Sequence, residues 1–371
     1  MDLRAYLRHL DYLLVAIGVA LVAYGATMVY FATRHDIAGN PTYFLRNQVI
    51  FAAIGLGVCV ALTFFDYERA RTWQWALYAV ALLAVIVVYA FPQIRGSHRW
   101  IPLPLFNLQA SELALVILTL TLPAFLTDRL QQMGTWRVTI LSLVYVGVPA
   151  LIVFAQPDFG TSMVFGVLVL TALLFFGTPW THFAAIAGAL VVGLVAVFKL
   201  LPMVGLHLVQ KYQVDRLLTF LHPASNPRGS GYNITQSLIA VGSGALHGRG
   251  DLATQTTLDF LPEHHTDFIF AVIGERYGFV GAAVLLGLFV LLIWRALRIA
   301  TLSRDLFGAM VAGSIAAMFL FEVFVNIGMT IGIMPITGIP LPFVSYGGSA
   351  LITNLMMIGL LEGIHLRGRA G

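Results

Sequence analysis

Residues 12–33 read YLLVAIGVALVAYGATMVYFAT, a run without a charged side chain that decides the class of fold. A spanning helix needs about 20 consecutive, mostly apolar residues to cross the core of a bilayer. Over the whole chain 59% of residues are hydrophobic and 10% are charged, whereas soluble domains carry about 25% charged residues. No polar stretch is long enough to fold as a separate soluble domain. The sequence therefore predicts a single integral membrane domain over residues 1–371.

Further apolar runs of helix length follow the first one, and they predict an all-α polytopic membrane protein with about ten transmembrane helices. A long connection, about residues 203–266, separates the seventh span from the eighth. No internal symmetry relates the two halves, which disfavours a transporter built from inverted repeats. The predicted spans are residues 12–33, 47–65, 73–91, 105–127, 137–156, 160–178, 182–202, 267–295, 306–333 and 343–365.

The arginines predict the orientation of these helices. If the N-terminus lies inside, eleven arginines fall on the inner side and four fall in the short outer connections. Cytoplasmic loops carry the excess of basic residues, and long loops are exempt from this bias. Both termini are therefore predicted to be cytoplasmic and the 203–266 connection extracytoplasmic. The same arginines account for the net charge of +4, so nucleic acid is not a predicted partner.

Polar motifs gather on the predicted outer side. They are GSHRWIPLPLFNLQASE (96–112), QPDFGTS (156–162), FLPEHHTDFIF (260–270) and MPITGIPLPFVSYGGS (334–349). Irregular backbone at membrane depth is tolerated only against protein or a wet cavity, so the segment rich in proline and glycine is expected to line an outer cavity. The long connection carries apolar stretches such as LLTFL and LIAV, and we expect short helices lying on the outer surface there.

Asp267 stands at the predicted start of the eighth span, where a carboxylate suits a general base. The alternative from local sequence is that Asp267 is only the N-cap of that helix. His264 and His265 precede it, but neighbouring residues rarely ligate one metal together, so a zinc site is not predicted.

Other ionisable residues have both functional and structural interpretations. Glu112 is predicted about two turns inside the fourth span, where an unpaired charge is costly, so it is either functional or paired. Asp158 is either a turn former or a site residue. Arg99 suits phosphate recognition, and Trp100 suits the membrane interface. Glu275 and Arg276 are interpreted as an internal ion pair that braces helices.

The quoted motifs resemble those of the SEDS (shape, elongation, division and sporulation) family, and the match runs from about residue 93 to the C-terminal end. The resemblance implies a ten-span membrane glycosyltransferase that polymerises peptidoglycan from lipid II, for cell elongation and shape. It places the essential aspartate of the HTDF motif at Asp267. The substrate-binding residues it implies are Arg99, Trp100, Glu112, Asp158, Lys211, Arg216, Gln236, Ser237, Glu263, His265 and Ser345.

The implied reaction is a single inverting displacement. Asp267 takes a proton from the GlcNAc 4-hydroxyl, which attacks the MurNAc anomeric carbon while undecaprenyl pyrophosphate leaves. Arg99, Lys211, Arg216 or a divalent cation (Mg²⁺ or Mn²⁺) are candidates for stabilising the leaving group. The sequence shows no ligand cluster that demands the cation, so no metal site and no certain cofactor are predicted.

One motif departs from the family pattern. The family reads QPSExxK near the fourth span, whereas this chain reads QASELAL, with Ala110 for the proline and Leu115 for the lysine. Glu112 has therefore lost the partner that the resemblance implies. It is expected either to be protonated or to pair with another basic group such as Arg99.

The resemblance also implies the cellular setting. It points to the bacterial cytoplasmic membrane, an outward-facing site, and a class B penicillin-binding protein as the crosslinking partner. Lipid II is the implied substrate, undecaprenyl pyrophosphate the product, and membrane lipids the surroundings. Two other functions stay open: a lipid II flippase, which would use the same intramembrane carboxylates, and a non-enzymatic scaffold for cell-wall assembly.

Overall fold

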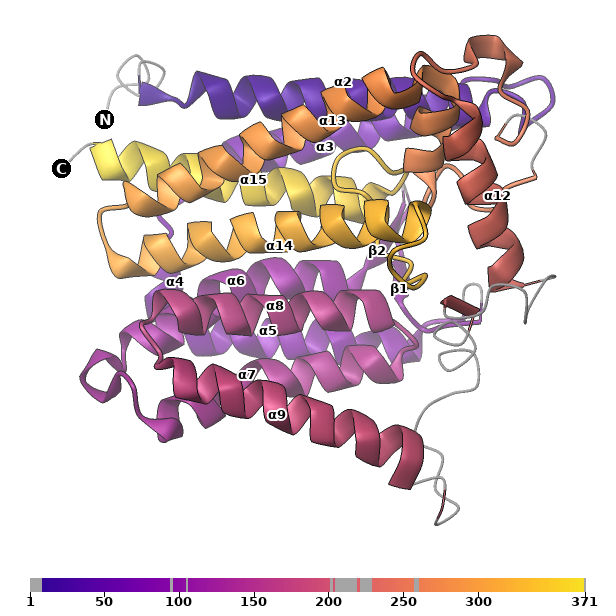
Figure 1. The fold of residues 1–371 in the computed structure, drawn as a ribbon. Helices are drawn as coiled ribbons and strands as arrows, with labels where there is room; N and C mark the ends of the chain where they lie inside the picture. The colour runs from indigo at the N-terminus through magenta and orange to yellow at the C-terminus, as the bar shows by residue number, and fades with distance from the viewer. Residues whose placement is uncertain are drawn as a thin grey trace.

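The computed structural model describes residues 9–93, 96–104, 106–200, 203, 219–220, 229–256 and 260–369. Its long helices lie side by side in one bundle, with both termini at one end and α12 (Ser230–Ser243) at the other (Figure 1). The long helices are α2 (Tyr12–Thr33), α3 (Tyr43–Phe64), α5 (Gln74–Val87), α6 (Ala110–Thr127), α7 (Trp136–Ala155), α8 (Phe159–Phe175), α9 (Trp180–Val195), α13 (Ile269–Thr301), α14 (Leu306–Thr330) and α15 (Gly348–Arg369).

These helices confirm a helical membrane protein. Seven of them are long and apolar enough to cross a bilayer: α2, α3, α6, α7, α13, α14 and α15. The apolar helices over Gln74–Ala90, Phe159–Phe175 and Trp180–Val195 are shorter, and each of the ten coincides with one predicted apolar run. The number of membrane crossings and the side on which the termini lie stay predictions.

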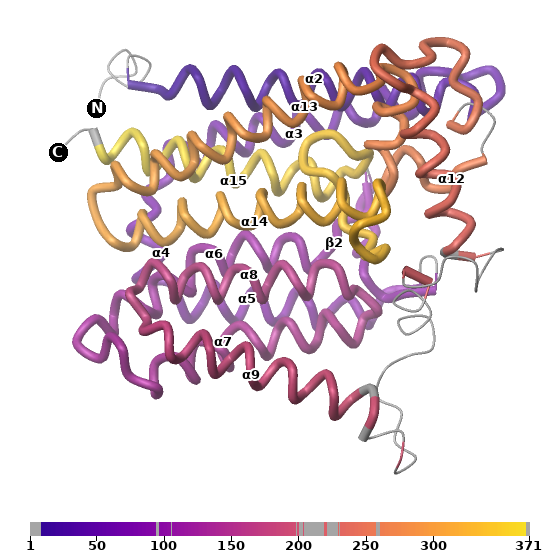
Figure 2. Tube along the Cα trace, in the orientation of Figure 1, coloured from indigo at the N-terminus to yellow at the C-terminus, as the bar shows by residue number. Residues whose placement is uncertain are grey.

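Helices α6 and α15 form the centre of the bundle. In each of them 89% of the apolar window is buried, against 33% in α3 and 28% in α13. Figure 2 shows α14 and α15 running between α2, α3 and α13 on one side and α5 to α9 on the other. The peripheral helices direct leucine, valine and isoleucine side chains outward, as lipid-facing surfaces require.

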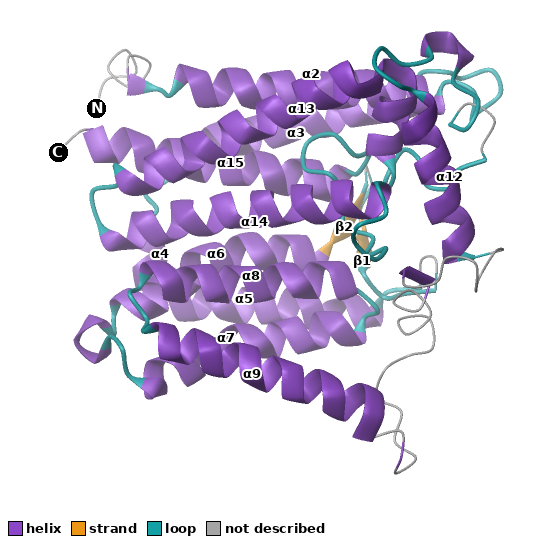
Figure 3. Ribbon diagram, viewed as in Figure 1, coloured by secondary structure: helices purple, strands orange, loops and turns teal. Residues whose placement is uncertain are grey.

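The prediction of an entirely helical chain is wrong at one place. Strands β1 (Trp100–Pro102) and β2 (Asn107–Gln109) form an antiparallel hairpin, in which Trp100 lies opposite Gln109. Figure 3 shows it at the end of the bundle away from the termini. Pro102 and Pro104 disfavour a helix here because proline lacks an amide donor and clashes with the preceding turn. Helix α6 therefore begins at Ala110 rather than at residue 105, and Glu112 lies in its first turn instead of two turns inside it.

The long connection contains helix, as predicted. Helix α12 packs on α13 and α14 and crosses the end of the bundle in Figure 1. The chain after α12 approaches α13 so closely that a Cβ on Gly248 would lie 2.2 Å from the Arg276 carbonyl oxygen. Gly278 has a φ of 61° and interrupts the helical geometry of α13 at this contact. Glycine is the residue that permits such a backbone.

Glu275 and Arg276 do not pair with each other, so the predicted ion pair between them is wrong. The buried Glu275 carboxylate accepts hydrogen bonds from the backbone amides of Thr254, Gln255 and Thr256, at 2.8–3.0 Å, and from the Thr256 hydroxyl. Arg276 pairs with Asp251 at 2.5 Å, and its guanidinium lies 3.8 Å from the centre of the Phe31 ring. Both residues therefore fix the connection between α12 and α13 onto α13.

Candidate active site

Asp267 lies just before α13 and is not its N-cap, so that alternative interpretation is wrong. The N-cap is Phe268, and the helix starts at Ile269 without a side-chain cap. The backbone reaches Asp267 through a tight turn at Glu263, whose φ is 53°. The Glu263 carbonyl accepts hydrogen bonds from the amides of residues 266, 267 and 268 at 3.1–3.3 Å. This turn fixes the backbone at the half-buried Asp267 independently of helix capping.

Asn326 of α14 fixes the backbone of Asp267. This asparagine is fully buried, and its Nδ2 donates to the Asp267 carbonyl at 2.9 Å and to the Ile339 carbonyl at 2.8 Å. Gly338 lies beneath the carboxylate, because a Cβ there would be 3.5 Å from Asp267 Oδ2. Asn326 was not among the residues predicted from the sequence, although an amide inside an apolar span is a signal for buried polar contacts.

The segment 334–349 is bonded to the HHTD motif at two further points. The Ser345 hydroxyl donates to the Thr266 carbonyl at 2.6 Å and accepts from the Leu341 amide at 2.8 Å. The Tyr346 amide donates to the His265 carbonyl at 2.9 Å. The His265 ring lies between Phe44 and Tyr346, with ring centres 5.2 and 5.8 Å away. Segment 334–349 thus packs directly against the HHTD motif, and Ser345 acts as a brace between them. The outer cavity that this segment is expected to line stays a prediction.

Asp158 is the centre of a second polar cluster. It is the N-cap of α8 through a hydrogen bond from the Thr161 amide, as expected for a turn-forming aspartate. Its Oδ2 also accepts from Gln109 at 2.9 Å and from Ser111 at 3.1 Å. Arg99 approaches Oδ1 at 3.9 Å and donates to the Gln156 carbonyl at 3.1 Å. The motifs 96–112 and 156–162 therefore meet in space.

Glu112 is held by a hydroxyl rather than by a cation. Its carboxylate accepts from Thr353 of α15 at 3.1 Å and is 8% exposed. The alternative that Arg99 replaces the missing lysine as its partner is wrong, because Arg99 pairs with Asp158. Leu115 stands where the family has lysine and is buried in the core. Thr353 gave no local signal in the sequence.

The remaining predicted site residues have mixed placements. Trp100 lies in β1, beside Arg99. Ser237 of α12 donates to the Thr330 carbonyl at 2.8 Å, so it attaches α12 to the end of α14, and Gln236 is half-buried next to it. The Glu263 carboxylate accepts from the Thr266 hydroxyl at 3.1 Å. Lys211 and Arg216 lie outside the described residues.

Residues 337–349 connect the two clusters. At one end, Gly338 and Ile339 contact Asp267 and Asn326 as described above. A Cβ on Gly160 in α8 would lie 3.1 Å from the Thr337 carbonyl, so the start of α8 packs directly on this segment. At the other end, the Ser349 hydroxyl accepts from the Gln109 amide at 2.8 Å and donates to the Asn107 carbonyl at 2.9 Å. Asp267 and Asp158 thus border one region at the end of the bundle away from the termini (Figure 1).

The adjacent histidines belong to a group of closely spaced atoms that could in principle bind a metal. Among the described residues, the ligand atoms of Asp36, His264 and His265 lie within 4.8 Å of one another. However, the His264 ring nitrogens lie 2.9 and 3.0 Å from the carbonyl oxygens of Leu261 and Ala32. Both nitrogens therefore face hydrogen-bond acceptors rather than a common metal position. Mg²⁺ and Mn²⁺ also prefer oxygen ligands, so this group does not fit them.

Comparison with known proteins places the chain among relatives. A family model described as a cell cycle protein (FtsW/RodA/SpoVE) matches residues 11–369. The peptidoglycan glycosyltransferase MrdB of Escherichia coli K12 is 39% identical over 359 residues, covering 96% of this chain and 94% of MrdB. A chain from a solved peptidoglycan synthase complex, described as coordinating polymerization and crosslinking, superimposes with a TM-score of 0.80 at 28% identity, covering 98% and 99% of the two chains.

A second solved structure agrees with this placement. The rod shape determining protein RodA of Thermus thermophilus superimposes with a TM-score of 0.68 at 29% identity, and 96% of each chain is covered. The family match extends over nearly the whole described bundle, including both polar clusters. This chain therefore belongs to the FtsW/RodA/SpoVE family.

Proposed function

We propose that this protein is a peptidoglycan glycosyltransferase that polymerises lipid II at the outer face of the bacterial cytoplasmic membrane, for cell elongation and shape. The observation that carries the proposal is the fixation of Asp267, whose backbone is held by Asn326 and by the Glu263 turn while its carboxylate stays partly accessible. The 39% identity to a relative named peptidoglycan glycosyltransferase supports the reaction class.

In this proposal Asp267 is the general base. It accepts the proton of the GlcNAc 4-hydroxyl as that oxygen bonds to the MurNAc anomeric carbon, and the bond to undecaprenyl pyrophosphate breaks with inversion. A base held in one position spares the reaction the entropic cost of finding it. The hydrogen bonds to the Asp267 carbonyl and amide supply this fixation without using its carboxylate.

The leaving pyrophosphate requires positive charge. Arg99 lies in the second cluster, where its 3.9 Å approach to Asp158 leaves the pairing loose. An arginine fork suits phosphate oxygens, so we assign Arg99 to pyrophosphate binding, with Lys211 and Arg216 as further proposed contacts. A divalent cation, if bound, would supply the same charge neutralisation. We assign substrate contacts also to Trp100, Glu112, Gln236 and Glu263.

The proposed topology has ten crossings, cytoplasmic termini and an extracytoplasmic α12. It rests on the ten apolar helices and on the arginine-rich end that carries the termini. The proposed partner is a class B penicillin-binding protein. Its support is the similarity to a chain of a peptidoglycan synthase complex that coordinates polymerization with crosslinking.

The test is polymerisation of purified lipid II without ATP, by the full chain together with its partner transpeptidase. The wild type is expected to form long glycan and Asp267→Asn none, because the amide keeps the shape but cannot take the proton. Asp251→Asn is the matched control, since this exposed carboxylate of the same outer region binds only Arg34 and Arg276 among the described residues.

The outcomes separate the competing functions. Glycan from the wild type and Asp251→Asn, but none from Asp267→Asn with an unchanged unfolding temperature, supports the polymerase. Equal product from all three proteins would remove Asp267 as the base. If the protein is a flippase, a separate polymerase supplied with lipid II in the outer leaflet should make glycan whether or not this chain is present. If the protein is a scaffold, every Asp267 variant should keep full function.

A further inference from the structure

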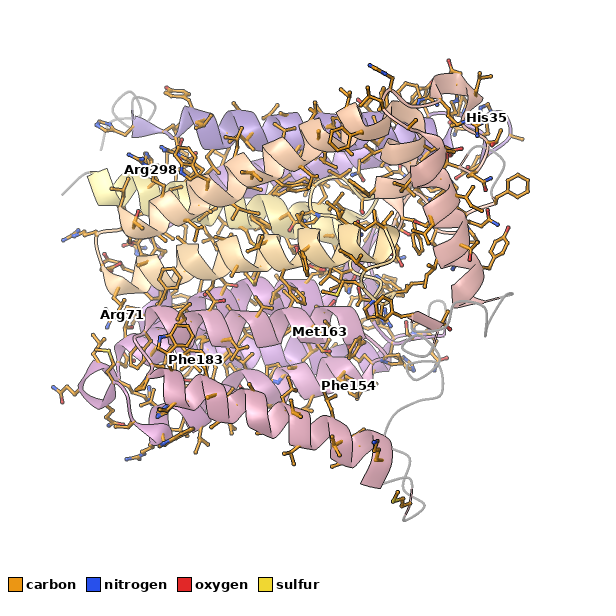
Figure 4. The ribbon with its side chains drawn as sticks, in the orientation of Figure 1. His35, Arg71, Phe154, Met163, Phe183 and Arg298 are labelled. Atoms are coloured by element: carbon orange, nitrogen blue, oxygen red, sulfur yellow. The ribbon has the colours of Figure 1, made fainter. Side chains whose placement is uncertain are left out.

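A polar cavity lies at the other end of the bundle, where the termini emerge. It is bordered by the start of α5, the end of α6 and the start of α7, and has a volume of about 350 Å³. Figure 4 places Arg71, which binds Asp128 of this cavity, at that end. The proposed glycosyl transfer uses none of the lining residues, which include Gln74, Trp75, Asp128, Arg129, Arg137 and Leu141. We call it the arginine cavity.

The arginine cavity carries excess positive charge. The single acidic residue in its lining, Asp128, is already engaged: Arg71 donates to Oδ1 at 3.3 Å and Gln74 donates to Oδ2 at 2.7 Å. No carboxylate of the described residues forms a salt bridge with Arg129 or Arg137. The cavity therefore offers two cationic side chains whose charge is not compensated within the described chain.

The two arginines are arranged to receive an anion. Arg129 lies with its guanidinium 3.7 Å from the centre of the Phe125 ring, and one nitrogen donates to the Phe125 carbonyl at 2.8 Å. Its remaining donors stay available in a fixed orientation. Arg137 occupies the first turn of α7, and the N-cap Thr135 makes no capping hydrogen bond there. The positive end of this helix thus adds to the charge of Arg137 instead of being neutralised.

Exposed apolar side chains next to the arginine cavity indicate what kind of molecule carries the bound anion. Trp75 at the mouth is exposed, and so are Leu141, Val144, Val148 and Leu151 along α7. These α7 residues recur every three or four positions, so they form one continuous lipid-facing strip that starts in the cavity lining. An exposed tryptophan marks the depth of the lipid headgroups. A soluble phosphate would use only the cavity, whereas a phospholipid would use both surfaces.

We infer that the arginine cavity binds the phosphate headgroup of an anionic phospholipid, with its acyl chains along α7. Arg129 and Arg137 donate to the phosphate oxygens, and Trp75 lies beside the glycerol region. The arginine distribution predicts that this end faces the cytoplasm, where basic pockets between helices suit anionic lipids. The site is separate from the outer clusters around Asp267 and Asp158.

The experiment measures lipid binding to the purified full chain in neutral detergent by native mass spectrometry. Phosphatidylglycerol is titrated against phosphatidylcholine, which carries the same phosphate without a net charge. The double variant Arg129→Gln/Arg137→Gln is expected to bind phosphatidylglycerol roughly tenfold to thirtyfold more weakly, as loss of two basic groups at an anionic headgroup implies. The control is Arg298→Gln, an exposed arginine at the same end (Figure 4) that lies near Trp294 but outside the cavity.

The site is supported if only the double variant loses phosphatidylglycerol binding, while Arg298→Gln binds this lipid like the wild type. If Arg298→Gln loses phosphatidylglycerol binding equally, or if the double variant loses none, the site is overturned. The binding is then a general attraction between anionic lipid and basic protein. Full displacement of phosphatidylglycerol by millimolar inorganic phosphate would also overturn it, because the site would then serve a soluble anion. If the double variant does not fold in neutral detergent, Gln132→Glu is measured instead. It adds a negative charge to the cavity lining and must weaken phosphatidylglycerol binding.

Discussion

Replacing Asn326 with alanine tests whether a fixed backbone makes Asp267 effective. The change removes one buried Nδ2 group and leaves two carbonyl oxygens, those of Asp267 and Ile339, without this donor. A buried polar group left unsatisfied costs about 1–3 kcal/mol. Water can reach the half-buried Asp267, so we expect the two losses together to lower the free energy of unfolding by about 2–4 kcal/mol.

The effect on activity should exceed the effect on folding. A displacement of a reacting group by about 1 Å costs about 100-fold in rate. Asn326→Ala is therefore expected to form glycan from lipid II about 100-fold more slowly, measured as an initial rate below its unfolding temperature. Asn326→Asp should show an equally large decrease in the initial rate, because it keeps the shape of the side chain but points a carboxylate oxygen at the two carbonyl oxygens.

Thr330→Val is the matched control for these variants. Thr330 is also fully buried and lies one turn further along α14, but its hydroxyl donates only to the Asn326 carbonyl, at 2.7 Å. We expect it to polymerise at nearly the wild-type rate. If folded Asn326→Ala and Asn326→Asp also kept the wild-type rate, the reasoning that backbone fixation positions Asp267 would be refuted.

Three further predictions concern the connection between α12 and α13. Gly248→Ala should lower the unfolding temperature in detergent far more than Gly287→Ala, because its Cβ would lie 2.2 Å from the Arg276 carbonyl, whereas Gly287 has nothing within 4 Å. Glu275→Gln should lower the free energy of unfolding by about 2–4 kcal/mol, because an amide cannot accept all four hydrogen bonds that the carboxylate accepts. Amide hydrogen exchange at residues 254–256 should become faster in this variant, and an unchanged exchange rate would contradict the prediction. Hydrogen bonds from Arg276 and Arg34 lower the pKa of Asp251 below its ordinary value of 3.8, so its stabilisation is complete above that pH and is lost as the pH falls through the lowered value. The difference in unfolding temperature between wild type and Asp251→Asn should therefore shrink in acid, and a difference that grows there would be inconsistent with these hydrogen bonds.

Hydrophobic runs alone predicted most of the fold. The first span was predicted at residues 12–33, and α2 covers Tyr12–Thr33, because the ends of a spanning helix follow the ends of its apolar run. The prediction was wrong where apolar residues belong to a hairpin. The predicted fourth span began at residue 105 and so included Phe106 and Leu108, which belong to the hairpin instead. Their hydrophobicity resembles that of a span, whereas Pro102 and Pro104 just before them disfavour a helix.

The site was predictable only in part. Asp267, Asp158, Arg99 and Glu112 stand in motifs that a single sequence reveals. Their partners depend on contacts between segments far apart in the chain: Asn326 is 59 residues from Asp267, and Thr353 is 241 residues from Glu112. Nothing local distinguishes Thr353 from any other hydroxyl in a helix. The loss of the family lysine at Leu115 therefore suggested the wrong partner for Glu112.

The braces around Asp267 bind main-chain atoms rather than side chains. Asn326 donates to the carbonyls of residues 267 and 339, Ser345 to that of residue 266, and His264 faces that of Ala32. Every amino acid carries the same backbone carbonyl, so these hydrogen bonds do not depend on which side chain stands at the accepting position. In a saturation-mutagenesis library, Asn326 and Ser345 should thus accept few replacements, while Ile339 should accept any apolar residue that fits its packing.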